Sequence, residues 1–217
     1  MAWLSKPDNA WRKYILEPNG LKPGWVEDSR PISPEIRLSK RELFALIILA
    51  YVFADQNLQW RVGFDLNDEE PNDGFIAKGK SKIRIEHKVV AQMQKTEVLE
   101  AILELYKKSA AKGANYGKSR ILVIQINKES DHGGLIKISD LRKAIGNTSP
   151  FDKVFTLSVV ATKGENNHIS AIHLIQHYPP LAKERANEVP IIQVDFNFMT
   201  GTATIPYAGF VAHKLPN

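Results

Sequence analysis

The chain has 217 residues, and its 29 Lys and Arg residues exceed its 24 Asp and Glu residues, which gives a net charge of +5 and a pI near 9.3. This length and an ordinary composition exclude disorder throughout and suit one domain with a full core, or one domain with an arm. The chain has no cysteine, which excludes disulfides, thiolate metal sites and a thiol nucleophile, and its basic excess agrees with a polyanionic partner.

Targeting and membrane segments are not expected. The first residues, MAWLSKPDNAWRK, include an early Pro and Asp and no apolar stretch of the length that a secretory signal requires. The longest apolar run, Leu43 to Ala54, has twelve residues, whereas a membrane-spanning helix needs about 20. We therefore interpret this run as a buried helix and expect a cytoplasmic protein without a membrane partner.

The first 37 residues are predicted to form an arm on a main domain, 38–217. This segment contains Pro7, Pro18, Pro23, Pro31, Pro34, Trp3, Trp11 and Trp25. The prolines restrict regular structure to short pieces such as residues 10–16. Because the tryptophans lie between the prolines, we expect the arm to pack through them.

A central helix is predicted over residues 40–55. Ser39 precedes Glu42 by three positions and an apolar run follows, which is the signature of a capping box at a helix start. The helix is apolar on nearly all sides and is therefore expected at the centre of the fold. Two further helices are predicted, at 96–112, where apolar residues recur with helical period, and at 139–145.

Strands account for most of the remaining pattern. They are predicted at residues 60–65, 74–78, 82–90, 120–126, 151–161, 168–176, 191–198 and 202–207. The segment RILVIQI, 120–126, is almost continuously apolar and is expected to be a central strand buried on both faces. The last two strands are predicted to form a hairpin. This order of elements predicts an α/β sandwich around a central mixed sheet flanked by helices.

Charged and apolar side chains alternate along the predicted strand 82–90. Period-two geometry places Arg84, Glu86 and Lys88 on one face of the sheet. The isoleucines between them lie on the other face. One face of this strand is therefore predicted to be core and the other functional or solvated.

A hairpin turn before this strand predicts a second carboxylate beside Glu86. Gly79 and Lys80 suit a two-residue turn, which pairs residues whose numbers sum to 159, so Asp73 is predicted to face Glu86. Opposed side chains have Cβ atoms about 4.5–5.5 Å apart, where two carboxylates repel each other. A divalent cation such as Mg²⁺ or Mn²⁺ relieves that repulsion and bridges to substrate phosphates. Lys88 then has the position to orient or deprotonate an attacking water, or to neutralise charge developing on the phosphate.

These residues resemble the PD-(D/E)XK signature of the restriction-endonuclease-like superfamily: Pro-Asp, a variable spacer, then Asp or Glu, any residue, and Lys. The matching segments are Pro71-Asn72-Asp73, where Asn72 interrupts the usual Pro-Asp pair, and Glu86-His87-Lys88. The resemblance covers residues 39–126 and extends to the order of a helix, the motif hairpin, a helix and a buried strand. It implies a restriction-endonuclease-like sandwich and a Mg²⁺-dependent endonuclease that hydrolyses phosphodiester bonds in DNA.

The resemblance also implies roles for single residues. Asp73 and Glu86 are expected to bind Mg²⁺, with Mn²⁺ as a substitute, and Lys88 to be the catalytic lysine. The main-chain carbonyl of His87 is a further expected ligand. Glu42 matches a carboxylate that many members add from the first helix, and its alternative role is the third position of the capping box.

Basic residues around Glu86 are candidates to contact the nucleic acid, because their density attracts phosphate. The candidates are Lys78, Lys80, Lys82, Arg84, Gln92 and Lys95. Alternatively, Lys80 and Lys82 keep a hairpin soluble, and Gln92 and Lys95 are solvated residues at a helix start.

The sequence therefore predicts a restriction-type DNA endonuclease. Cutting both strands needs two centres, so a homodimer is expected, with the arm or the C-terminal hairpin as interface. Two alternatives stay open: a catalytically inactive module that binds nucleic acid or protein on the same fold, and a general α/β domain. A Glu-x-Lys triplet on an amphipathic strand is, by itself, commonplace.

His173 and His177 have the spacing of a zinc pair on a helix. The segment around them, ISAIHLIQHYPP, is instead predicted to be a strand. In a strand their side chains lie about 13 Å apart, so structural histidines are expected.

Overall fold

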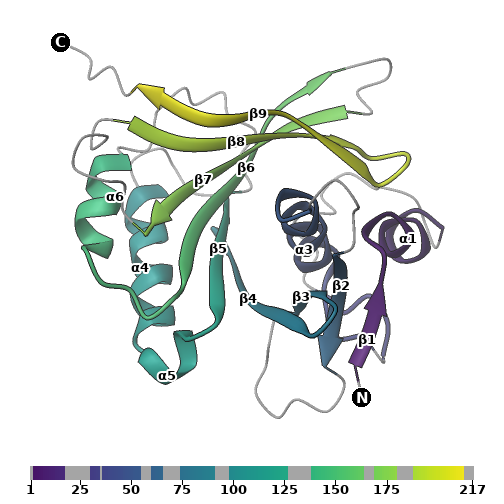
Figure 1. Cartoon of the computed structure of the whole chain (residues 1–217), viewed down its shortest axis with the longest axis horizontal. Coiled ribbons are helices and arrows are strands. Elements are labelled where there is room, and N and C mark those ends of the chain that lie inside the picture. Colours follow the sequence, from purple (N-terminus) through teal and green to yellow (C-terminus); the bar gives the residue numbers. More distant parts are fainter. Residues whose placement is uncertain are drawn as a thin grey trace.

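The computed structural model describes residues 2–17, 30–34, 36–54, 60–65, 74–90, 98–126, 138–163, 169–179 and 188–212. Within them, nine strands form one sheet whose order across the sheet is the order along the chain (Figure 1). The strands are β1 (Ala2–Ser5), β2 (Arg61–Asp65), β3 (Phe75–Lys78), β4 (Ser81–Val90), β5 (Arg120–Ile126), β6 (Lys153–Lys163), β7 (Ile169–Tyr178), β8 (Glu188–Asn197) and β9 (Thr202–Ala212).

The sheet is mixed, as the element order predicts. β1 to β4 are antiparallel, β4 to β6 are parallel, and β6 to β9 are antiparallel again. Parallel neighbours require a crossover, and helices lie in both of these connections. The fold is therefore α/β with a mixed sheet.

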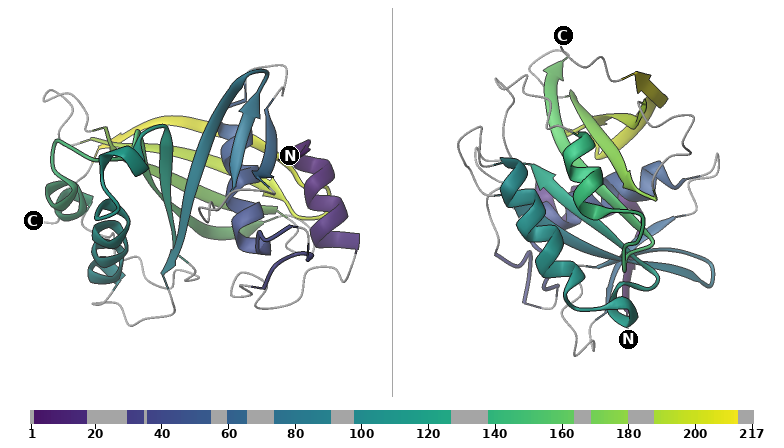
Figure 2. Two further views of the ribbon diagram at one scale, coloured as in Figure 1. Left: turned by 90° about the horizontal axis from the view of Figure 1, so that it is seen from below. Right: turned by 90° about the vertical axis from the view of Figure 1, so that its left-hand side faces the viewer.

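Helices cover both faces of the sheet (Figure 2). The helical segments are α1 (Pro7–Trp11), the π-helical η1 (Arg12–Leu16), α3 (Lys40–Val52), α4 (Val98–Ala110), α5 (Ala114–Gly117) and α6 (Ile138–Ile145). One core lies between the sheet and α1, η1 and α3, and the other between the sheet and α4 and α6. None of the helices in the described ranges is long and apolar enough to cross a membrane.

The central helix α3 is enclosed by the curved sheet. It contacts β2, β3 and β4 at one end of the strand order and β8 and β9 at the other, and Figure 1 shows it between these two parts. Every residue from Leu43 to Leu49 is fully buried. The predicted central helix and its capping box, formed by Ser39 and Glu42, are both confirmed.

The N-terminal segment joins the core of the fold. β1 pairs with β2, and the fully buried Trp11 packs against Phe44 and Phe196. Trp11 Nε1 also donates a 2.7 Å hydrogen bond to the carbonyl of Phe198. Trp11 thus packs as predicted, whereas the side chains of Trp3 and Trp25 lie outside the described part. β1 is not predicted from the sequence, because four residues show too little of a pattern.

β5 is the central strand of the sheet in strand order and in burial. It has four strands on either side within the described residues, and all of its residues except Ile126 are buried. Leu122 and Ile124 belong to the core under α4 and α6, while Ile121 and Val123 belong to the core around α3. The prediction of a central strand buried on both faces is confirmed.

Candidate active site

β4 presents two chemically different faces, as its alternating sequence predicts. Ile85 is fully buried in the core around α3. Glu86 lies on the other face, where it contacts residues of α4 and α5, and Lys88 Nζ lies 3.1 Å from Glu86 Oε1. Glu86 and Lys88 therefore share the face that the sequence predicts.

The hairpin of β3 and β4 has the predicted register. Ile76 pairs with Ile83, and all paired residues of the two strands have numbers that sum to 159. The backbone N–H of Ile85 donates a 3.0 Å hydrogen bond to the carbonyl of Gly74, so the register continues one residue beyond β3. The next residues back along the chain lie outside the described part, and these are Pro71, Asn72 and Asp73. The pairing of Asp73 with Glu86 stays a prediction.

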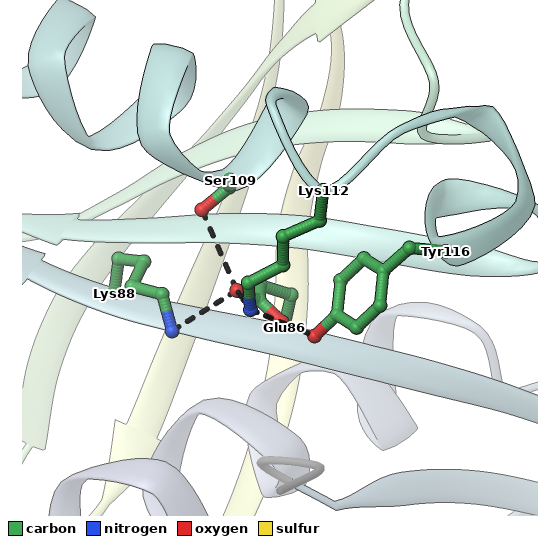
Figure 3. Close-up of polar contacts among 5 residues, drawn as sticks. All are labelled: Glu86, Lys88, Ser109, Lys112 and Tyr116. Carbon is green, nitrogen blue, oxygen red and sulfur yellow. Dashed lines mark hydrogen bonds and ion pairs between the residues drawn. The ribbon is translucent and has the colours of Figure 1, made fainter. Parts of the chain in front are cut away.

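Glu86 is buried beneath the end of α4, with 1% of its surface exposed (Figure 3). Its Oε1 lies 2.8 Å from Lys112 Nζ and 3.1 Å from Lys88 Nζ. The same oxygen accepts a 3.4 Å hydrogen bond from Ser109 Oγ, and Oε2 accepts one from the Tyr116 hydroxyl. Two ammonium groups and two hydroxyls thus replace the water that a buried carboxylate loses.

These donors keep Glu86 ionised. Burial raises the pKa of a carboxyl group, because the charged form loses its hydration. Hydrogen bonds from Lys112 and Tyr116 and the charge of Lys88 act in the opposite direction, and the pKa of Glu86 is lowered below its ordinary value. Glu86 is therefore a carboxylate at neutral pH, the form that binds a cation.

Sequence reasoning does not identify Lys112 and Tyr116 as site residues. They lie 26 and 30 residues from Glu86 along the chain. Lys112 Nζ also donates a 3.0 Å hydrogen bond to the Tyr116 hydroxyl, and the Arg120 guanidinium carbon lies 3.9 Å from the centre of the Tyr116 ring. Their place in the chain is what could have identified them. A parallel crossover brings the chain back to the N-terminal end of β4 just before β5 begins, so residues late in the crossover lie beside β4.

The side chain of His87 lies on the face of β4 opposite to Glu86. It is buried, and its Nε2 lies 2.9 Å from Oε1 of Gln125 on β5. Burial lowers the pKa of His87 to about 4, with help from the charges of Arg41 and Lys88 and against the hydrogen bond to Gln125. His87 is therefore neutral at physiological pH and is part of the core.

The direction of the His87 main-chain carbonyl follows from the hydrogen bonds of the preceding residues. The N–H of Arg84 bonds to Ser119 towards β5, whereas the N–H of Ile85 bonds to Gly74 towards β3. Because peptide groups alternate in direction along a strand, the carbonyl of His87 points to the β3 side. This is the side from which Asp73 is predicted to approach.

The predicted basic contacts have different environments. Lys80 is exposed at the hairpin turn, and Lys78 and Arg84 are partly buried. Lys82 forms an ion pair with Asp65 of β2, and its Nζ lies 4.0 Å from the centre of the Phe75 ring. The charge of Lys82 is thus shared with Asp65. Two further candidates, Gln92 and Lys95, lie outside the described residues.

Glu42 caps the start of α3. Its carboxylate accepts a 2.6 Å hydrogen bond from the backbone N–H of Ser39, and its own N–H donates to Ser39 Oγ at 3.3 Å. In the described part of the chain, this carboxylate contacts Ser39 and not Glu86, which faces α4 and α5. The metal-binding role of Glu42 stays a prediction.

His173 and His177 lie on strand β7, as predicted. His177 is buried, and its Nε2 lies 2.9 Å from Thr156 Oγ1. Burial, together with the charge of Arg142, lowers the pKa of His177 to about 3. His177 is therefore a neutral core residue.

Two oxygen atoms of the described residues have the chemistry of metal ligands. Oε2 of Glu86 accepts one hydrogen bond among them, and a carboxylate oxygen has two lone pairs. With the carbonyl of His87, it offers the oxygen ligands that Mg²⁺ prefers. No group of three His, Cys, Asp or Glu side chains within these ranges is arranged to hold a metal, and the predicted ligand Asp73 lies outside them. Neither a model of a known protein family nor a curated protein matches this chain.

Proposed function

We propose that this protein is a Mg²⁺-dependent endonuclease that hydrolyses phosphodiester bonds in DNA, with Asp73, Glu86 and Lys88 as its catalytic residues. The observation that carries the proposal is the position of Glu86 and Lys88. They share one face of β4, with 3.1 Å between Nζ and Oε1, in a hairpin whose register runs to Gly74. Continued by one pair, that register would set Asp73 opposite Glu86.

The carboxylates of Asp73 and Glu86 would hold the cation, with the His87 carbonyl as a further ligand and Glu42 as a contested fourth. Bound Mg²⁺, or Mn²⁺ in its place, would supply a Lewis acid that lowers the pKa of water and counters charge on the phosphate. Glu86 suits this role because its neighbours keep it ionised although it is buried.

Lys88 acts on the reacting atoms in this proposal. Hydrolysis forms a bond between a water oxygen and phosphorus, and this water loses a proton. The bond to the leaving sugar oxygen breaks, and that oxygen gains a proton from solvent. The Lys88 ammonium orients the water and stabilises the charge that develops on the phosphate oxygens. Glu86 holds this ammonium in place, and 30% of the Lys88 side chain is exposed, which lets it meet a substrate.

We extend the proposal to a restriction-endonuclease-like sandwich. Its support is the order of elements, since α3, the β3–β4 hairpin, α4 and β5 follow one another as in the core of that superfamily. A sheet of nine strands, as counted in the described residues, is unusual for the superfamily. β6 to β9 are then an extension of the common core.

The second candidate is a catalytically inactive module that binds nucleic acid or protein on the same fold. The observation in its favour is the crowding at Glu86 Oε1, where Lys88, Lys112 and Ser109 converge. In such a module Glu86 would be a structural counter-ion for the two lysines, and no cation would bind.

Cleavage assays separate the two candidates. The protein is incubated with supercoiled plasmid and short duplexes in Mg²⁺, Mn²⁺ or EDTA, beside Asp73→Asn, Lys88→Ala and a control, Lys108→Ala. Lys108 suits the control because it is an exposed residue of α4 that pairs with Glu104. We expect the wild type and the control to cut with Mg²⁺ and not in EDTA, and the two site variants to lose at least about 100-fold in rate. Identical traces for wild type and site variants under every metal contradict the proposal, and DNA binding without cleavage then favours the module.

We also propose a homodimer, because cutting both strands needs two centres. The support is strand β9, the last strand of the sheet in the described residues, which contains no charged residue and exposes Ile205 and Tyr207. An edge strand without charges favours pairing with a second copy, and because Pro206 lacks a backbone N–H, the pairing would run through the residues on either side of it. In sedimentation experiments, the wild type is expected to be a dimer and Ile205→Lys a monomer. A wild type that is monomeric at all concentrations contradicts the proposed homodimer.

A further inference from the structure

Two ammonium groups approach one carboxylate oxygen in this centre. Lys112 Nζ lies 2.8 Å and Lys88 Nζ 3.1 Å from Glu86 Oε1. Figure 3 shows Lys112 reaching this oxygen from the turn after α4 and Lys88 reaching it from β4. One carboxylate balances the charge of one ammonium, and like charges at such distances repel each other. One carboxylate oxygen thus serves two ammonium groups, and an anion that binds one of these ammonium groups relieves their repulsion.

Lys112 is the more exposed of the two lysines on Glu86. Its side chain is 40% exposed, whereas that of Glu86 is 1% exposed. An ammonium has three donors, and in the described part of the chain Lys112 uses two of them, on Glu86 and on the Tyr116 hydroxyl. The third donor remains for a ligand that arrives from solvent.

Among the described residues, Glu86 has three partners besides Lys112. The Tyr116 hydroxyl holds Oε2, and Lys88 and Ser109 hold Oε1. The Tyr116 ring is itself fixed, because it stacks on the guanidinium of the buried Arg120 at 3.9 Å. Lys112 can therefore leave Oε1 while four side chains keep the carboxylate and its hydroxyl partner in place.

We propose that Lys112 is a phosphate-binding residue of this centre, and that its ammonium moves from Glu86 to a phosphate of bound DNA. The inference rests on the proposed function in one respect, since that function places DNA at Glu86 and Lys88. A lysine is suited to the exchange because it is a compact charge on a flexible stem. The Lys112 ammonium then attracts and holds the substrate, while Lys88 acts on the reacting phosphate.

Binding without cleavage tests the role of Lys112. The affinity of the full chain for a fluorescent DNA duplex is measured by anisotropy in EDTA over a range of salt concentrations, for the wild type, Lys112→Gln and Lys108→Gln. Both variants remove one positive charge from the same end of α4, but Lys108 pairs with Glu104 and does not reach Glu86. We expect Lys112→Gln to raise the Kd about tenfold and to lower the salt slope by about 0.9, the value of one phosphate contact. Lys108→Gln is expected to change the Kd less than about twofold.

A third variant separates phosphate binding from a structural role. Lys112→Arg keeps the positive charge, so it is expected to keep the wild-type salt slope and a Kd within about threefold of the wild type. Urea unfolding of each variant shows whether the fold is retained. If Lys112→Arg loses as much DNA affinity as Lys112→Gln, the inference is overturned, because the role of Lys112 is then in packing and not in binding phosphate.

The remaining outcomes separate this inference from the proposed nuclease. Equal effects of Lys112→Gln and Lys108→Gln, or no DNA binding by the wild type, overturn the role of Lys112. A wild type that cuts DNA while Lys112→Gln binds normally contradicts the phosphate site alone. A wild type that binds DNA through Lys112 but does not cut it with Mg²⁺ supports the phosphate site and contradicts the nuclease.

Discussion

The backbone N–H of Ile85 donates a 3.0 Å hydrogen bond to the carbonyl of Gly74. This bond carries the β3–β4 register to the residue that follows Asp73 in the chain. Gly74 has a φ of +108°, which L-residues with a side chain rarely adopt, and a Cβ added there would lie 2.5 Å from Leu46 Cδ1. The approach to the proposed catalytic hairpin therefore depends on a glycine packed against α3.

Replacement of this glycine is expected to destabilise the protein strongly. Gly74→Ala combines backbone strain with a clash against Leu46 and is predicted to lower the free energy of unfolding by about 2–4 kcal/mol. Gly79→Ala is the matched control, because Gly79 has a φ of +58° but no atom within 4 Å of the added Cβ. Gly79→Ala is expected to lower the free energy of unfolding by about 1–2 kcal/mol. Urea unfolding measures the free energy of unfolding of both variants. Equal losses of stability in Gly74→Ala and Gly79→Ala contradict the role of packing against α3.

Removal of the Tyr116 hydroxyl is expected to raise the pKa of Glu86. Tyr116→Phe takes away a donor to Oε2, and a hydrogen bond to the charged form of a carboxyl group lowers its pKa. Carbon-13 NMR of the Glu86 carboxyl group during a pH titration measures the change. Tyr207→Phe, on the distant strand β9, is the control and is expected to leave the titration as in the wild type. An unchanged pKa of Glu86 in Tyr116→Phe shows that the hydroxyl does not stabilise the carboxylate.

The protein is expected to lose stability in mild acid because of two buried histidines. Burial lowers the pKa of His87 to about 4 and that of His177 to about 3, from an ordinary value of 6.5. Between these values the unfolded chain binds more protons than the folded chain, so stability falls as the pH falls below about 6.5. From about pH 7 to about pH 5 the loss is roughly 2 kcal/mol for each histidine.

Urea unfolding at a series of pH values checks this loss. His177→Gln removes one titrating group and is expected to reduce the loss by about half. A wild-type stability that stays constant down to about pH 5 contradicts the prediction. Glu86 titrates below its ordinary value, so its own contribution is lost at more acid pH, outside this window.

Glu42→Gln separates helix capping from metal binding. Gln satisfies a capping box as Glu does, so this variant is expected to keep the wild-type unfolding free energy, while Glu42→Ala is expected to lose about 1 kcal/mol. Urea unfolding and the cleavage assay are run on both variants. Cleavage lost in a fully stable Glu42→Gln assigns the carboxylate to the metal, and cleavage retained leaves Glu42 with the cap alone.

Local rules explain which parts of the fold follow from the sequence. The shared face of Glu86 and Lys88 follows from the period of a strand, and the pairing of Ile76 with Ile83 follows from the turn at Gly79. The capping box before α3 depends on residues three positions apart. Each of these features involves a few neighbouring residues, whose geometry is set by backbone sterics and hydrogen bonding.

Contacts between segments that are distant in the sequence do not follow from local rules. Trp11 donates to the carbonyl of Phe198, which is 187 positions away, and this contact depends on a sheet that curves around α3. The partners of Glu86 have the same origin, since Lys112 and Tyr116 are helix and turn residues with no pattern that marks them. The packing of α4 and α5 on β4 decides which cations and hydroxyls surround the buried carboxylate of Glu86.

The sequence by itself therefore determined the hairpin, its register and the face that carries Glu86 and Lys88, because period and turn geometry act locally. Only the tertiary structure decided that Glu86 is buried, ionised and shared between Lys88 and Lys112. The physical reason is that a charge is stabilised by whatever groups lie within a few ångströms in space. Packing of the parallel crossover onto the sheet, and not spacing along the chain, brings those groups to β4.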